Sequence, residues 1–150
     1  MTDWAAEAER ALVDFHQVAR LGGIELGSDD LSVERLPAPH RSPTRLPPGK
    51  MGVYAFWGDG GWLKVGKVGP NSNARYTSQH YLAGSAPSTL AASLLASPPN
   101  DRAFDPGQVG AWMRERTCRL NILMPASRPR ELLSLLEAFL HLRLRPRFEG

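Results

Sequence analysis

Residues 52–75 read GVYAFWGDGGWLKVGKVGPNSNAR, and this segment decides the fold of the chain. Valine, tyrosine, phenylalanine and tryptophan are frequent in residues 52–57 and 62–68, a composition typical of β-strands. The glycine-rich residues 58–61 between them predict a tight hairpin turn. The GPNSN segment that follows predicts a loop and then a helix that begins near Ser72. We therefore expect a β-hairpin that leads directly into a helix.

The length of the hairpin turn decides which side chains share a face of the sheet. A two-residue turn at Asp59 and Gly60 would put Tyr54 opposite Val65 and leave Lys64 on the other face. A three-residue loop with a glycine bulge would put Tyr54 opposite Lys64. Aspartate and glycine suit both turns, so the sequence leaves both registers open.

Apolar residues recur at helical spacing in several other parts of the chain. They predict an amphipathic helix at the N-terminus, a short helix after Pro87 capped by Ser88, and a long last helix capped by Ser127. The helices are expected over residues 2–20, 72–81, 88–97, 108–116 and 129–145.

One further strand is expected over residues 118–124, where apolar and polar residues alternate. Prolines punctuate residues 24–50, which predicts an extended connection without regular structure. The order of elements is helix, hairpin, helices, strand and helix. This order predicts an α+β domain with a small antiparallel sheet flanked by helices.

The composition excludes several classes of protein. The 150 residues suffice for one domain with its own core. Cys118 is the sole cysteine, so neither an internal disulfide nor a cysteine-based zinc site is expected. No signal peptide and no apolar run of roughly 18 residues is present, so no membrane partner is expected. We expect a soluble, cytoplasmic protein.

Charge is distributed unevenly along the chain. Residues 1–35 hold three basic and eight acidic residues, whereas the remaining residues hold 15 basic and seven acidic ones. A basic main body suits a polyanionic partner such as nucleic acid. An ordinary solvated surface explains the same charges equally well.

A set of polar residues suits the hydrolysis of phosphodiester bonds, which needs an activated water and groups that stabilise negative charge. A tyrosine acts as a base when its pKa falls, and a neighbouring lysine lowers that pKa. Arginine offers phosphate a planar fork of donors, and one carboxylate with waters can hold Mg²⁺. The candidates are Tyr54, Lys64, Lys67, Arg75 and Glu137.

Each candidate also has an ordinary structural explanation. Tyr54 suits the interior of a strand, while the lysines and Arg75 suit exposed positions. Glu137 lies on the polar stripe of the last helix, which can simply face water. His80 is a candidate second base or phosphate ligand, although a single histidine on a short helix is usually structural or exposed.

The same residues resemble the motif of the GIY-YIG nuclease superfamily. The resemblance consists of GVY at residues 52–54, KVG at residues 64–66, Arg75 on a helix and Glu137 on a late helix. It implies an α+β fold with a small three-stranded antiparallel sheet flanked by helices.

The resemblance also divides the chain. It covers about residues 50–146, so we expect residues 50–150 to form a GIY-YIG-like nuclease domain. Residues 1–49 lie outside it and are expected to form an N-terminal helix followed by a proline-rich extension.

The resemblance implies a catalytic role for four residues. Tyr54 is the general base, and Lys64 replaces the second tyrosine of the motif and tunes Tyr54. Arg75 binds the scissile phosphate. Glu137 holds one divalent metal ion, Mg²⁺ or Mn²⁺.

Two further residues are expected to bind nucleic acid, namely Lys67 and His80. Many family members have a histidine four residues after the arginine, where this chain has Gln79, with His80 one position later. Many members also have an asparagine after the last helix, and this chain has none there.

The sequence thus predicts a metal-dependent DNA endonuclease, with a homodimer as an open option. One alternative is a catalytically degenerate module of the same fold that binds nucleic acid or protein. Another is an oligomerising or partner-binding protein that works through its acidic N-terminal helix.

Overall fold

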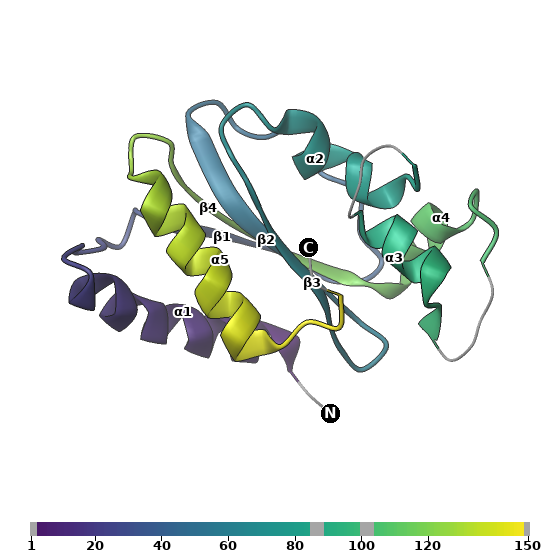
Figure 1. Ribbon diagram of the computed structural model, residues 1–150, viewed down its shortest axis with the longest axis horizontal. Helices are drawn as coiled ribbons and strands as arrows, with labels where there is room; N and C mark the ends of the chain where they lie inside the picture. The colour runs from purple at the N-terminus through teal and green to yellow at the C-terminus, as the bar shows by residue number, and fades with distance from the viewer. Residues whose placement is uncertain (1–2, 85–88, 100–103, 149–150) are drawn as a thin grey trace.

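The computed structural model describes residues 3–84, 89–99 and 104–148, and within them four strands form one antiparallel sheet (Figure 1). The strand order is β1-β4-β2-β3. The predicted α+β class and antiparallel sheet are confirmed, but the prediction of three strands is wrong. The strands are β1 (Ser32–Leu36), β2 (Lys50–Gly58), β3 (Gly61–Val68) and β4 (Cys118–Pro125).

β1 is the strand that the sequence did not predict. It pairs with β4, where Val33 lies opposite Ile122 and Glu34 lies opposite Asn121. Its five side chains are exposed or half-buried, so they lack the apolar alternation that marks a strand in a sequence. The prolines that follow also indicate an irregular segment. β1 therefore depends on a partner strand that lies far along the chain.

The helices cover both faces of the sheet, with α1 and α5 on one face and the shorter helices on the other (Figure 1). None of the described helices is long and apolar enough to cross a membrane. The helical segments are α1 (Trp4–Leu21), α2 (Asn73–Thr77), the 3₁₀ turn η1 (Gln79–Tyr81), α3 (Leu90–Ala96), α4 (Val109–Arg116) and α5 (Arg130–Leu144).

A first hydrophobic cluster joins α1 and α5 to the sheet. Phe15 of α1 and Leu136 of α5 belong to the same cluster as Val53 of β2 and Ile122 of β4. Residues 1–49 thus supply one helix to this cluster and one strand to the sheet. The boundary near residue 50 separates two regions of sequence that share one core.

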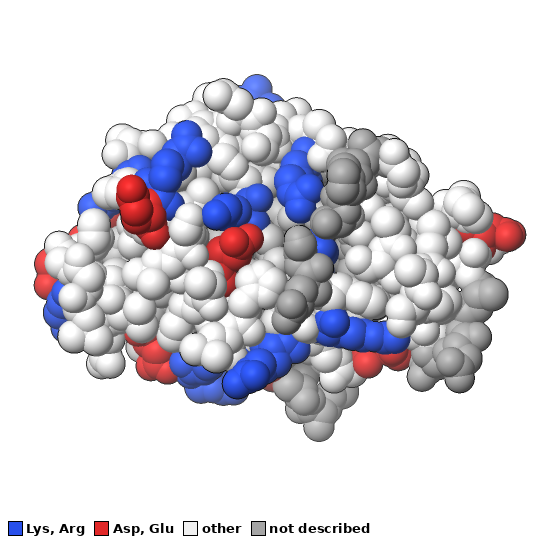
Figure 2. Space-filling view, in the orientation of Figure 1, with Lys and Arg blue, Asp and Glu red and all other residues white. Residues whose placement is uncertain are grey.

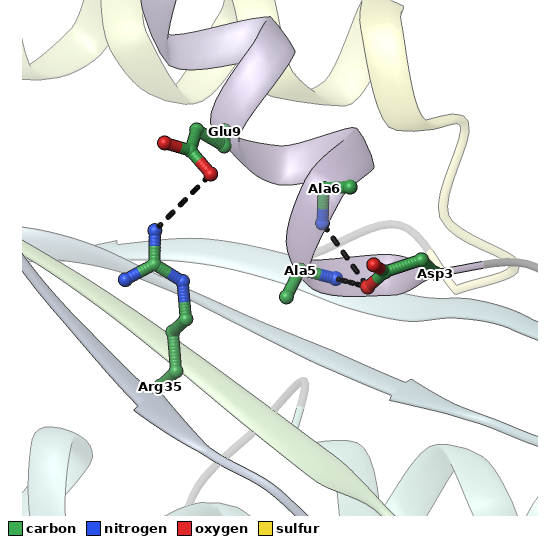
Figure 3. A network of polar contacts seen from close by, with 5 residues as sticks. All are labelled: Asp3, Ala5, Ala6, Glu9 and Arg35. Atoms are coloured by element: carbon green, nitrogen blue, oxygen red, sulfur yellow. Dashed lines mark hydrogen bonds and ion pairs between the residues drawn. The ribbon is translucent and has the colours of Figure 1, made fainter.

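Polar contacts fix the start of α1 and link it to β1 (Figure 3). The carboxylate of Asp3 accepts hydrogen bonds from the backbone N–H groups of Ala5 and Ala6 at 3.1 and 3.2 Å, which caps the helix. Arg35 of β1 reaches toward Glu9 of α1, with Nη2 3.9 Å from Oε2. An exposed pair of this kind stabilises by about 1 kcal/mol at most, so packing determines where α1 lies.

A second hydrophobic cluster fills the opposite face. Tyr54 and Phe56 of β2 and Leu123 of β4 share this cluster with Leu94 of α3 and Met113 of α4. The cluster also includes Tyr76 of α2 and Tyr81 of η1. It therefore holds the segment after the hairpin against the part of β2 that carries Tyr54.

The predicted cap of the last helix is wrong. Residues 126–128 form a turn, and α5 begins after Pro129, which makes no side-chain cap bond. Ser88, the predicted cap of the short helix, lies outside the described residues. The Thr89 hydroxyl caps α3 by accepting a hydrogen bond from Ala92 N at 3.1 Å.

Candidate active site

The hairpin between β2 and β3 closes with a two-residue turn. Gly58 pairs with Gly61, which leaves Asp59 and Gly60 as the turn. Their φ angles are 53° and 78°, as a type I′ turn requires. On its own, this turn would leave Tyr54 and Lys64 on opposite faces.

A register shift inside the strand ladder reverses that outcome. It lies between Phe56 and Trp57, and beyond it Phe56 pairs with Lys64 and Tyr54 pairs with Gly66. One extra residue in β3 changes the face of every later side chain. Tyr54 and Lys64 therefore share the face that carries the second cluster. Neither register considered from the sequence occurs, yet the two side chains share one face.

Gly66 makes room for the Tyr54 ring. A Cβ atom at position 66 would overlap Oη and Cζ of Tyr54. Because glycine has no side chain, the phenol occupies that space across β3. Tyr54 is fully buried there. The glycine of the KVG motif is thus required by the position of the Tyr54 ring.

Lys64 is a buried amine whose Nζ lacks a hydrogen-bond partner in the part of the chain that the structure describes. It is 0% exposed, and its Nζ makes no hydrogen bond. Burial lowers the pKa of Lys64, the Arg75 charge lowers it further, and Glu137 raises it. Buried charges are normally paired and hydrogen-bonded. The Lys64 amine therefore lacks an acceptor that an anionic ligand would provide.

Arg75 and Glu137 come to the same region from different helices. Arg75 lies on α2 and is half-buried, while the Glu137 side chain on α5 is 25% exposed. The charges of both act on the pKa of Tyr54 and on that of Lys64. Since β3 is an edge strand, side chains from both faces of the sheet can meet around it. The structure thus brings the four predicted catalytic residues together.

The charged side chains of this region are visible on the surface. Figure 2 shows Lys and Arg side chains close to an acidic group in the part of the surface between α5 and α2. Lys67 lies on the opposite face of β3 from Tyr54. Its Nζ donates to Ser134 Oγ at 3.0 Å and lies 3.8 Å from Glu137 Oε1. Lys67 is therefore a neighbour of Glu137, and its exposed ammonium lies at the rim.

His80 contacts Tyr54 directly. His80 Nε2 lies 2.5 Å from Tyr54 Oη, and the backbone N–H of Leu90 donates to His80 Nδ1 at 3.1 Å. Because Nδ1 accepts a bond, the proton of the neutral ring must be on Nε2. His80 therefore donates to the Tyr54 oxygen, and the Tyr54 hydroxyl proton must point elsewhere.

The predicted role of His80 in binding nucleic acid does not fit this position. Both ring nitrogens of His80 are already engaged, Nε2 with Tyr54 Oη and Nδ1 with the backbone N–H of Leu90, so neither is available to a DNA strand. Burial lowers the pKa of His80 to about 2, and the nearby charges of Arg75, Arg119 and Lys64 act in the same direction. His80 is a neutral hydrogen-bond donor behind Tyr54.

The pKa of Tyr54 is also different from the expectation. Burial raises it, while the charges of Arg75 and Arg119 lower it and that of Glu137 raises it. The sequence suggested that Lys64 would lower this pKa. The cations that act on the Tyr54 phenol are instead the two arginines.

Arg119 is the residue that the sequence reasoning missed. It is fully buried in β4, and its Cζ lies 5.5 Å from the Tyr54 ring centroid. Its guanidinium donates to Asn121 Oδ1 at 2.8 Å, to Tyr76 O at 2.6 Å and to Tyr81 Oη at 3.4 Å. The signal in the sequence was the pair of polar residues at 119 and 121, which face away from the apolar residues of the same strand.

A metal site here would rest on one carboxylate. No group of three or more His, Cys, Asp or Glu side chains that could hold a metal lies within residues 3–84, 89–99 and 104–148. Glu137 borders an open depression of ≈ 560 Å³ that His141 and Arg145 also line, and whose lining does not include Tyr54, Lys64 or Arg75. Mg²⁺ retains several waters and binds proteins through one or two carboxylates. Glu137 therefore fits a water-rich site with a single protein ligand.

Comparison with known proteins gives no relative. No family model, no curated protein and no solved structure matches this chain. The resemblance to the GIY-YIG superfamily therefore rests on the GVY and KVG segments, Arg75 and Glu137 alone.

Proposed function

We propose that this chain is a divalent-metal-dependent DNA endonuclease that hydrolyses phosphodiester bonds beside β3. The observation that carries the proposal is the buried Lys64 amine without a hydrogen-bond partner, in the same region as Tyr54, Arg75 and Glu137. A buried polar group without a hydrogen bond is costly in the free protein. A phosphate oxygen would supply the missing acceptor, and costly groups of this kind cluster at functional sites.

Arg75 and Lys64 hold the scissile phosphate in this proposal. The planar fork of Arg75 matches two phosphate oxygens, and Lys64 donates to a third acceptor from inside the fold. Lys67 contacts a phosphate at the exposed rim beside Glu137. These fixed donors stabilise the negative charge that grows on the phosphate during attack.

Tyr54 receives the proton of the attacking water in its phenolate form. The Nε2–H of His80 donates to the oxygen that carries the phenolate charge. Arg75 and Arg119 also favour the phenolate, whereas burial opposes it. Cleavage should therefore become faster as the pH rises through the raised pKa of Tyr54.

Glu137 would hold the metal ion. When bound, the ion would act as a Lewis acid toward the phosphoryl group. The chain itself supplies the phosphate clamp and the proton acceptor.

The charge distribution suits DNA as the substrate. Residues 36–150 hold 15 basic and seven acidic residues. Cations around the site would neutralise phosphates and release their counterions. Binding should therefore weaken steeply as salt rises.

Glu137→Gln tests the proposal against Glu131→Gln. Glu131 is an exposed glutamate in the first turn of the same helix, so the control has the same change in charge. We expect wild type and Glu131→Gln to nick supercoiled plasmid with Mg²⁺ or Mn²⁺, and Glu137→Gln to lose at least about 100-fold in rate. Equal melting temperatures would show that all three are folded. Nicking by Glu137→Gln at the wild-type rate would overturn the metal assignment.

One observation favours a binding module that has lost catalysis. Burial raises the pKa of Tyr54, which keeps the phenol protonated at neutral pH and leaves no base. Such a module would bind DNA equally with Mn²⁺ and with EDTA and cleave it in neither condition, even at alkaline pH. The same plasmid assay therefore separates the two functions.

A further inference from the structure

A second cleft lies on the other side of α2 from the candidate active site. Its volume is ≈ 330 Å³, within the roughly 300–1,000 Å³ range of ligand pockets. It lies between β1, the segment 41–47 and the Tyr76 side of α2. Its lining includes Glu34, Leu36, Arg41, Arg45, Tyr76 and Leu123.

Two arginines give the cleft a positive rim. Arg41 and Arg45 are exposed, and neither makes an ion pair or hydrogen bond within the part of the chain that the structure describes. Both guanidinium groups are therefore free to take an anion. Phosphate matches their planar donor geometry.

A carboxylate and an apolar wall complete the lining. Glu34 Oε1 accepts a hydrogen bond from Asn121 Nδ2 at 2.8 Å, which holds the carboxylate in place while Oε2 keeps its acceptor capacity. Leu36, Tyr76 and Leu123 supply an apolar surface. The cleft thus suits a ligand with an anion, a flat apolar body and an amino group.

The cleft is tied to the element that carries the phosphate clamp. Tyr76 directly follows Arg75 on α2. Asn73, the first residue of α2, accepts a hydrogen bond from Leu46 N at 2.7 Å, which anchors the segment that carries both arginines. A DNA strand at Arg75 would therefore have a neighbouring nucleotide close to the cleft.

We propose that this cleft binds an unpaired nucleotide of the DNA substrate next to the scissile phosphate. Arg41 and Arg45 take its phosphate, Tyr76 and Leu36 contact the base, and Glu34 accepts from an exocyclic amino group. A base inside a duplex cannot enter, and thymine has no exocyclic amino group. The substrate class is thus DNA with an unpaired adenine, cytosine or guanine. This inference rests on the proposed function, because it assumes that DNA lies at Arg75.

The test measures binding without cleavage, by fluorescence anisotropy in EDTA. Three duplexes are compared: one fully paired, one with a single bulged cytosine and one with a single bulged thymine. For wild type we expect the bulged cytosine to bind about tenfold tighter than the paired duplex, with the bulged thymine between the two. Arg41→Gln/Arg45→Gln should bind the bulged and the paired duplexes equally. For this variant, the slope of the logarithm of the binding constant against the logarithm of the salt concentration should fall by about 1. Glu34→Gln should keep the preference for a bulge but no longer distinguish cytosine from thymine.

The matched control is Arg10→Gln/Arg20→Gln on α1, which removes the same charge from the opposite face of the sheet. It should keep the full preference of wild type. The proposed nucleotide site would be overturned if wild type bound paired and bulged duplexes equally. It would also be overturned if Arg41→Gln/Arg45→Gln retained the preference for the bulged duplex. Failure of the proposed function would look different: binding would keep its preference, but no variant or wild type would nick DNA with Mn²⁺.

Discussion

The guanidinium carbon of Arg119 lies 5.5 Å from the ring centroid of Tyr54, inside the protein and without a carboxylate partner in the described ranges. Its hydrogen bonds go to neutral groups, and the nearest carboxylate on this network, Glu34, is reached only through the Asn121 amide. A phenolate at Tyr54 would compensate this charge. Arg119 is therefore a positioning and electrostatic residue for the proposed base.

Charge removal at Arg119 should change the pH dependence of cleavage. Arg119→Gln removes a charge that lowers the pKa of Tyr54, so the rate should rise only at higher pH. We expect about a tenfold loss at neutral pH, which corresponds to one unit of pKa. Arg119→Lys loses the same hydrogen-bonding fork but keeps the charge, and its pH–rate profile should stay close to wild type. Identical profiles for both variants would refute the electrostatic role.

Tyr54→Phe should abolish cleavage while the fold remains. The variant keeps the ring that fills the space over Gly66 but leaves the Nε2–H of His80 without an acceptor, at a cost of about 1–3 kcal/mol. Tyr81→Phe is the matched control, since the Tyr81 hydroxyl also bonds a buried histidine, His40, at 2.6 Å. Both variants should lose similar free energy of unfolding in denaturant titrations. A Tyr54→Phe variant that still nicks plasmid would exclude Tyr54 as the base.

Lys64→Met should stabilise the free protein and destroy its function. Lys64 is fully buried without a hydrogen bond, and an apolar side chain of similar length removes the cost of desolvation. We expect a gain of about 1–4 kcal/mol in the free energy of unfolding and a loss of cleavage. Lys67→Met, at a 44% exposed side chain, should change stability by less than about 0.5 kcal/mol. A destabilised Lys64→Met would mean that Lys64 has a partner in the folded state.

Gly66→Ala should displace the Tyr54 ring. The new methyl group would overlap the phenol, which we expect to cost about 1–3 kcal/mol of stability and most of the cleavage activity. Gly61→Ala in the same strand adds a methyl group to open space and should cost less than about 0.5 kcal/mol. Thermal unfolding of both variants gives the comparison. Equal effects would contradict the close approach of Tyr54 to β3.

Stability should fall in acid because of the buried histidines. Burial lowers the pKa of His80 to about 2 and lowers that of His40, so below about pH 6.5 the unfolded chain binds protons that the folded chain does not. The stabilisation is complete above about pH 6.5 and is lost as the pH falls toward 2, by up to about 1.4 kcal/mol per pH unit for His80.

Denaturant titrations at several pH values measure this slope. In His80→Gln the free energy of unfolding should depend less steeply on pH, by the equivalent of about one bound proton. His16→Gln on α1 serves as the control for removing a histidine. A slope that is unchanged in His80→Gln would show that His80 does not couple folding to pH.

Local sequence was sufficient for most elements of the fold. The β-rich residues around a glycine turn predicted the hairpin, and apolar periodicity predicted α1, α4, α5 and β4 close to their observed ends. β1 was missed because its five residues are stabilised by pairing with β4 and not by a local pattern. Propensity and periodicity describe only neighbours along the chain, whereas strand pairing joins distant segments.

The candidate site was only partly predictable. Tyr54, Lys64, Arg75 and Glu137 were selected by residue type and spacing, and the structure brings them together. The burial of His80 and its bond to Tyr54 were not predictable, because they depend on how η1 packs on β2. Arg119 was missed because a single arginine in a strand gives no local sign of which rings surround it.

The residue types alone placed the hairpin turn within residues 58–61, because positive φ angles cost glycine and aspartate little. They also set which groups are available for chemistry. The tertiary structure selected the two-residue turn at Asp59 and Gly60, and it put Tyr54 and Lys64 on one face through one extra residue in β3. A shift of one residue costs little locally, but it moves every later side chain to the other face of the sheet. Packing of both faces of the sheet therefore selects the register.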